Sequence, residues 1–147
     1  NLSAWWNEED EEKFNERAQV LVEQYDKIVV LDSLHADGSY TLGENIADQG
    51  GLLVSYQAYM NTLKDKGIPA DIEGFTYSQR FYIGYANLWA QNLRPQEIMR
   101  RTKTDVHSLG KWRVNAALRN IEDFYTAFDI KEGDAMYLAP EERINIW

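Results

Sequence analysis

Apolar residues recur every three or four positions along the first part of the chain, which is the pattern of a helix with one buried face. Ser3 precedes this segment as an N-cap, and the acidic residues 8–12 suit both the positive end of a helix dipole and a solvated face. We therefore expect a first helix over Ala4–Tyr25. The residues expected to form its packing face are Phe14, Ala18, Leu21, Val22 and Tyr25.

The same periodicity predicts further helices beyond a turn signal at Asp37-Gly38-Ser39. A second long helix is expected over Gly43–Lys66, where Gly67-Ile68-Pro69 ends it. An aromatic-rich third helix is expected over Thr76–Asn92, and Pro95 opens a short fourth helix at its first turn. The expected packing positions of the second helix are Ile46, Leu53, Tyr56 and Met60, and the third helix carries Phe81, Tyr82, Tyr85, Leu88 and Trp89.

Weaker patterns fill the remainder of the chain. Lys27–Leu31 has the length of a short strand, and Lys103–Lys111 is loop-like. Arg113–Leu118 is compatible with an extended or a helical conformation, and Ile121–Phe128 predicts a short helix before an irregular tail over 137–147. The sequence thus predicts a mainly α-helical fold with at most two short strands, in which residues 1–147 form one unit.

Composition narrows the classes of function. With 147 residues and 44% hydrophobic content, the chain can form one domain that buries roughly 70% of its extended surface. The 24 acidic and 15 basic residues give a net charge of −9, which argues against nucleic acid as a partner. The lack of cysteine excludes disulfides and thiolate metal sites. No apolar run approaches the roughly 20 residues that span a bilayer. The start at Asn1 suggests a processed or excised chain.

Two carboxylates, Glu44 and Asp48, lie four residues apart at the start of the second predicted helix. This spacing places both side chains on one helical face, about 40° apart around the axis. Like charges that close require a metal ion or a basic side chain as partner. The neighbouring Asn45 adds a further polar group, and Gly50-Gly51 favours close packing beside the pair.

A second candidate constellation is Asp105-Val106-His107 with the following Arg113. An acid two residues from a histidine can orient the imidazole and keep it protonated, although a single loop histidine is often structural or exposed. If His107 and Arg113 converge with Glu44, they could stabilise developing oxyanion charge. His35 precedes the turn signal, and we interpret it as an exposed loop residue without a role.

The motifs at these positions resemble the C-terminal part of the catalytic domain in the neprilysin and endothelin-converting-enzyme family of zinc endopeptidases, which includes bacterial oligopeptidases. Residues 43–48 resemble the family's E-x-x-x-D signature, and residues 103–108 with Arg113 resemble its downstream block. Residues 1–6, Leu88-Trp89, Arg94-Pro95 and Trp147 follow in the family's order. The resemblance implies the helical C-terminal subdomain of a gluzincin-type metallopeptidase, with zinc as cofactor of the intact enzyme.

The resemblance also implies roles for the acid pair. Glu44 would be a zinc ligand, and Asp48 would hold a zinc-binding histidine through its other ring nitrogen. Hydrolytic zinc usually takes three protein ligands, and neither histidine of this chain lies in an H-E-x-x-H pair. That motif is therefore expected upstream of Trp5-Trp6, in another part of the catalytic domain. Alone, the chain is expected to be inactive and to bind no stoichiometric zinc.

The remaining roles concern the substrate. By resemblance, His107 would donate to the tetrahedral oxyanion, Asp105 would orient and charge His107, and Arg113 would bind a substrate backbone carbonyl. Leu88 and Trp89 would line the pocket for the side chain just after the scissile bond, which favours apolar residues there. Short peptides would be the substrates, and the family suggests an extracytoplasmic location.

Two further expectations stay open at this stage. The face of the second helix that carries Glu44 is expected to pack against the upstream part of the domain, so the isolated chain could self-associate through it. The five tryptophans and nine tyrosines could instead line a groove, as in a non-enzymatic helical module that binds a peptide or glycan, or they could be core residues.

Overall fold

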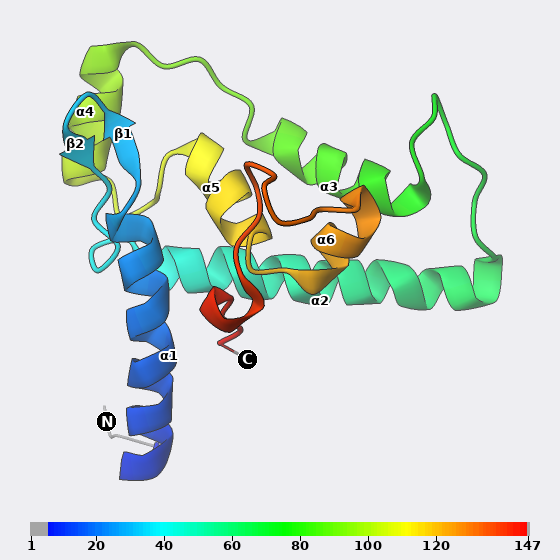
Figure 1. Ribbon diagram of the computed structural model, residues 1–147, viewed down its shortest axis with the longest axis horizontal. Helices are drawn as coiled ribbons and strands as arrows, with labels where there is room; N and C mark the ends of the chain where they lie inside the picture. The colour runs from blue at the N-terminus through cyan, green and yellow to red at the C-terminus, as the bar shows by residue number, and fades with distance from the viewer. Residues whose placement is uncertain (1–5, 147) are drawn as a thin grey trace, which may run out of the picture.

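The protein is mainly helical in the computed structural model, which describes residues 6–146 (Figure 1). This part of the chain forms six α-helices and one two-stranded antiparallel hairpin. The elements are α1 (Glu8–Asp26), β1 (Val29–Leu31), β2 (Leu34–His35), α2 (Leu42–Lys66), α3 (Tyr77–Leu88), α4 (Pro95–Thr104), α5 (Gly110–Leu118), α6 (Glu122–Phe128) and the 3-10 turn η1 (Pro140–Glu142). The predicted mainly α-helical class with at most two short strands is confirmed for the described residues.

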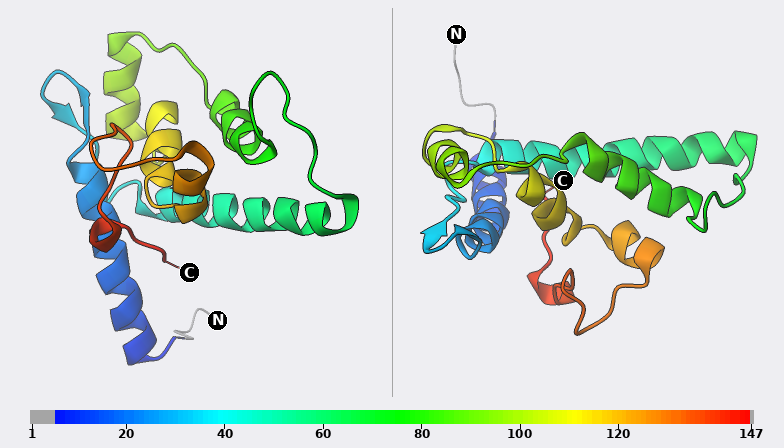
Figure 2. Two further views of the ribbon diagram at one scale, coloured as in Figure 1. Left: turned by 45° about the vertical axis from the view of Figure 1, so that its right-hand side comes forward. Right: turned by 90° about the horizontal axis from the view of Figure 1, so that it is seen from above.

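The 25-residue helix α2 is the element on which the others are arranged (Figure 1). Helix α1 crosses its N-terminal end, α3 and α5 lie along one side, and α4 packs beside the β-hairpin. Viewed from above, α5, α6 and the C-terminal segment lie on one side of the layer formed by α2 and α3 (Figure 2). This arrangement brings the start of α2 close to the start of α5.

Two groups of buried side chains hold these elements together. The first joins α1, α2, α5 and the C-terminal segment through Leu21, Tyr25, Ile28, Ile46, Ala116 and Ile146. The second joins α2, α3, α5 and α6 through Leu52, Tyr56, Tyr82, Val114, Ala117, Leu118, Ile121, Phe124 and Tyr125. Stacking of Tyr56 on Tyr82, at 5.1 Å between centroids, is typical of the aromatic contacts here. These aromatic residues are therefore core residues and do not line a groove.

The first helix begins later than predicted. Residues 6 and 7 are not helical, and Asn7 caps the helix by accepting a 2.8 Å hydrogen bond from the Asp10 backbone. An Asn side chain at this position satisfies a backbone N–H that would otherwise lack a partner. The predicted cap Ser3 and the predicted first turn at Ala4 lie outside the described residues. The packing face is confirmed, with Phe14 half-buried and the other four residues buried.

Helices α2 and α3 differ in how well their ends were predicted. The prediction for α2 is correct within one residue, and Gly67 ends it with a φ of 80°. Helix α3 starts as predicted, with Thr76 in a capping box. Its predicted end at Asn92 is wrong, because the chain turns at Trp89 to pack against α5. A Cβ on Gly110 would overlap the Gln91 carboxamide and lie 2.6 Å from the Trp89 carbonyl oxygen.

The segments with weaker patterns contain more regular structure than expected. The predicted loop Lys103–Lys111 shortens to residues 105–109, and Arg113–Leu118 is helical as part of α5. Strand β1 is shorter than predicted and pairs with β2, which the sequence did not indicate. His35 lies in β2, is exposed, and places Nδ1 at 2.8 Å from the Asp26 carbonyl oxygen. None of the helices in residues 6–146 has the length and apolar character to cross a bilayer.

Candidate active site

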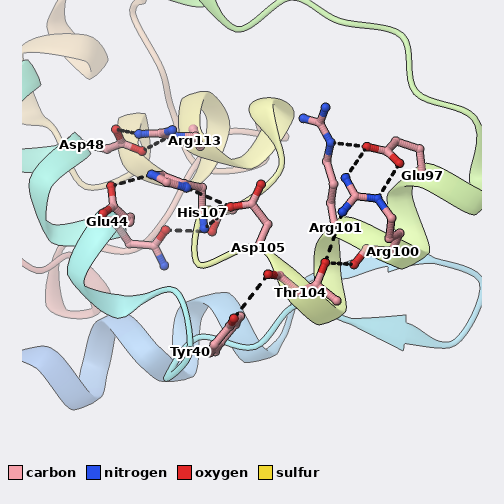
Figure 3. A network of polar contacts seen from close by, with 12 residues as sticks. Tyr40, Glu44, Asp48, Glu97, Arg100, Arg101, Thr104, Asp105, His107 and Arg113 are labelled. Carbon is pink, nitrogen blue, oxygen red and sulfur yellow. Dashed lines mark hydrogen bonds and ion pairs between the residues drawn. The ribbon is translucent and has the colours of Figure 1, made fainter.

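The predicted site residues converge where the first turns of α2 meet the 105–109 loop and the start of α5 (Figure 3). Glu44 and Asp48 project from the same face of α2, as the i, i+4 spacing predicts. His107 lies beside Glu44, and Arg113 lies beside Asp48. Each acid thus has its own basic partner within this chain.

The imidazole of His107 lies between two carboxylates. Its Nε2 is 3.1 Å from Glu44 Oε2, and its Nδ1 is 2.9 Å from Asp105 Oδ1. Acceptors at both ring nitrogens are satisfied together only by the protonated imidazolium, which has two N–H groups. The His107 backbone N–H also donates to Asp105 Oδ1, at 3.0 Å. This backbone hydrogen bond and that from the ring hold the pKa of the Asp105 carboxyl below its usual value.

Arg113 and Asp48 form a bidentate ion pair. The Nε and Nη2 of Arg113 donate to the two oxygens of Asp48, at 2.7 and 2.6 Å. Only 14% of the Arg113 side chain and 9% of the Asp48 side chain are exposed, and Asp48 raises the pKa of the Arg113 guanidinium. The guanidinium also lies 3.9 Å above the Trp89 ring. Arg113 is therefore held in one orientation.

The loop that carries His107 is attached to α2 by buried polar side chains. Ser108 donates to Asn45 at 2.8 Å, and Asn45 donates in turn to Thr41 at 2.9 Å. Asn45 is almost completely buried and lies between the two site acids on α2. Gln49, equally buried, donates to the Ile144 carbonyl oxygen. We assigned no role to Ser108 or Gln49 from the sequence, although a polar residue at position 49 interrupts the apolar stripe of α2.

A cavity of about 350 Å³ opens beside His107 and Arg113. Leu88 and Trp89, predicted to line a substrate pocket, lie on its wall, and Leu88 is 77% exposed. Asp105 lines the same cavity, whereas Glu44 and Asp48 do not. Residues that the sequence interpretation did not include also contribute to the wall, namely Ala90, Gln91, Arg101, Ser108, Leu109 and Gly110.

One carboxylate of the site, that of Glu44, is accessible to a metal ion. Within residues 6–146, no three His, Asp or Glu side chains are grouped as a metal site. Glu44 has a side chain that is 40% exposed, so its carboxylate is accessible as a single ligand. A carboxylate ligand fits zinc, which is usually held by four ligands in all. The residues present therefore fit one part of a zinc site.

Comparisons with known proteins identify the class. The profile of Peptidase family M13 matches residues 1–144, and the chain belongs to this family of zinc metalloendopeptidases. Human neprilysin is 34% identical over 151 residues, which cover all of this chain and 20% of neprilysin. The neutral endopeptidase of Lactobacillus helveticus is 37% identical over 150 residues, which cover the whole chain and 21% of that protein.

Solved structures of the family have the same fold. The zinc metalloprotease Zmp1 of Mycobacterium tuberculosis, in complex with an inhibitor, superimposes with a TM-score of 0.93 at 40% identity. The match covers 100% of this chain and 23% of the Zmp1 chain. The predicted resemblance and fold are thereby confirmed. The chain spans about a fifth of the length of the curated relatives that it matches.

Proposed function

We propose that this chain supplies part of the active site of a zinc endopeptidase that hydrolyses peptide bonds in short peptides, on the amino side of apolar residues. The observation that carries the proposal is the convergence of Glu44 and Asp48 from α2 with His107 and Arg113 from the α5 region. The family supports the reaction class. Leu88 and Trp89 on the cavity wall support an apolar preference.

For the metal, we propose that Glu44 binds zinc and that the other ligands come from the upstream part of the same catalytic domain. Zinc, when bound, polarises the scissile carbonyl and lowers the pKa of the attacking water. Asp48 would accept a hydrogen bond from one of the upstream histidines. A carboxylate has about four lone-pair positions, so its two bonds to Arg113 leave room for this third one.

The side chains of this chain would act on the peptide itself. His107 would keep Nδ1 on Asp105 and donate from Nε2, which contacts Glu44 in this structure, to the oxyanion that forms at the scissile carbonyl once Glu44 binds zinc. Asp105 would set the orientation of the ring. Arg113 donates to Asp48 through Nε and Nη2, which leaves Nη1 for a substrate backbone carbonyl. Arg113 would be in place before the substrate arrives.

Two observations test the function. The parent gene is expected to encode H-E-x-x-H upstream of Asn1, and its absence would contradict the enzyme interpretation. The full-length protein with zinc is expected to cleave short peptides and to lose this activity with a chelator, whereas the isolated chain is expected to be inactive. Peptide cleavage by the isolated chain would refute the proposal that the other zinc ligands come from the upstream part of the domain.

We also propose an extracytoplasmic location, whether periplasmic, cell-surface or secreted, on the strength of the family resemblance. Fractionation of source cells, with the full-length protein detected by antibody, tests it. The alternative of a non-enzymatic binding module has less support, because Tyr25, Tyr56 and Tyr82 are buried in the core.

A further inference from the structure

One charged residue on the cavity wall has no part in the mechanism described above. Arg101, in the last turn of α4, lines the cavity together with Trp89, His107 and Arg113. Its Nε donates to Glu97 at 2.7 Å, an ordinary i, i+4 ion pair. That pair accounts for only one of its three guanidinium nitrogens.

The neighbouring Arg100 uses the same carboxylate more completely. Its Nε and Nη2 donate to the two Glu97 oxygens at 2.9 and 2.8 Å, and these bonds, together with that from Arg101, lower the pKa of Glu97 to about 2. One carboxylate therefore serves two guanidinium groups, and the three side chains carry a net charge of +1. The surplus charge is placed on Arg101, because Arg100 has the bidentate contact.

The free part of Arg101 is directed away from Glu97. In Figure 3 its terminal nitrogens point away from the Glu97 carboxylate. Within residues 6–146, Nη1 has one contact at the limit of hydrogen bonding, 3.5 Å to Gln91 Oε1, and Nη2 has no hydrogen-bond partner. Gln91 itself is held against Gly110, which has no side chain to displace it. The Gln91 amide is therefore held in place, and the incompletely paired guanidinium of Arg101 lies beside it on the cavity wall.

The other charges on the cavity wall are already matched. Asp48, which does not line the cavity, forms an ion pair with Arg113, and Asp105 is paired with His107. In a chain with a net charge of −9, Arg101 is therefore a local positive charge on a cavity wall that also includes Leu88 and Trp89. This combination suits a group with an apolar stem and an anionic end.

We propose that Arg101 binds a carboxylate of the substrate peptide, so that the enzyme prefers peptides with an acidic group beyond the apolar residue that follows the cleaved bond. The inference rests on the proposed peptidase function and adds a class of substrate to it. The carboxylate could belong to an Asp or Glu side chain or to the C-terminus of a short peptide. Both would accept charge-assisted hydrogen bonds from Nη1 and Nη2.

The test uses the full-length zinc-loaded protein and matched peptides. One pair of peptides differs by Glu against Gln at the second position after the cleaved bond, and another differs by a free against an amidated C-terminus. We expect kcat/KM to be about tenfold higher for the anionic member of at least one pair, and the pair that responds identifies the source of the carboxylate. Added salt should reduce this ratio of kcat/KM for the anionic peptide to kcat/KM for the neutral one.

Arg101→Gln should bring this ratio close to one. Arg100→Gln is the matched control, because Arg100 also pairs with Glu97 but does not line the cavity. This substitution removes the same positive charge and should leave the ratio unchanged. An equal ratio in Arg101→Gln and the unmodified protein, or an equal loss in Arg100→Gln, would overturn the assignment while leaving the peptidase function intact. If the zinc-loaded protein cleaves none of the peptides, the proposed function fails and this inference fails with it.

Discussion

At the scale of single residues, Glu44 and His107 are in contact with each other but are expected to act differently. Their side chains meet at 3.1 Å and are about equally exposed, so proximity alone does not separate a metal ligand from an oxyanion donor. What distinguishes them is the second contact of His107, which places Asp105 at the opposite ring nitrogen. A histidine that donates from both nitrogens has no lone pair to offer a metal ion.

Two variants of the full-length protein separate these roles. His107→Ala should lower kcat by about a hundredfold or more, the scale for loss of an oxyanion donor, with zinc content unchanged. Glu44→Gln should chiefly lower zinc affinity, measured by competition with a chelator. Glu16→Gln on the exposed face of α1 is the control and should change neither quantity. Loss of zinc from His107→Ala would make His107 a ligand and contradict its assignment.

The buried ion pair of Asp48 and Arg113 should be important for stability as well as for the site. In Asp48→Asn the guanidinium loses its counter-charge in a position where only 14% of the Arg113 side chain is exposed. We expect the free energy of unfolding to fall by about 3 kcal/mol, as for other broken buried pairs, in urea denaturation followed by circular dichroism. Asp129→Asn, which breaks an exposed pair with Lys131, should leave it nearly unchanged. Similar effects of the two substitutions would argue against this account.

At the scale of elements, local sequence patterns predicted helices where a periodic apolar face or a recognisable start marks them, whereas α5, which has no side-chain cap, was left open between extended and helical. Thr76 and Pro95 are such starts, and both were identified correctly. The errors occur where contacts between distant segments decide the outcome. Helix α3 ends early because residues 89–91 pack against Gly110, and β2 exists only by pairing with β1. No local pattern records either contact.

The same division applies to the site. The spacing of Glu44 and Asp48 predicted a shared face, and the family motifs predicted which loop would meet it. The pairing of Asp48 with Arg113 joins residues 65 positions apart, and that of Asn45 with Ser108 joins residues 63 apart. The sequence offered a basic side chain as one possible partner of the acid pair, but it could not indicate which residue would take that place.

The contact between Gly110 and residues 89–91 can be tested by comparing two glycines. Gly110→Ala should destabilise the isolated chain by about 1–3 kcal/mol, because the new methyl group meets the Trp89 carbonyl and the Gln91 side chain. Gly84→Ala, in the interior of α3 with open space around it, should stabilise the chain by up to about 1 kcal/mol. Thermal unfolding followed by circular dichroism measures both. Stabilisation by both substitutions would show that the close approach is relaxed in solution.

At the scale of the whole molecule, one face of α2 has little protein over it. A depression of about 1010 Å³ follows this face, lined mostly by apolar and small residues, and Val54 on its wall is 72% exposed. The same face begins at Gly43, next to the proposed zinc ligand. The sequence predicted a contact with the upstream part of the domain on the face that carries Glu44, whereas the depression lies beside that face, because neither Glu44 nor Asp48 lines it.

We therefore expect the isolated chain to self-associate through this face, since exposed apolar patches of this kind favour association. Val54→Glu should shift the chain toward monomer in sedimentation-velocity experiments. Ile68→Glu is the control, because Ile68 is equally exposed but lies in the loop after α2, and it should leave the association unchanged. Association that is insensitive to Val54→Glu would place the contact elsewhere.

The fixed orientation of Arg113 has a consequence for the entropy of substrate binding. A free arginine side chain loses roughly 2 kcal/mol of rotamer entropy when it is immobilised. Here Asp48 and Trp89 immobilise the side chain during folding, before any peptide is present. A carbonyl that accepts from Nη1 would therefore bind with little further loss of freedom, so that part of the affinity for peptide is set when the chain folds.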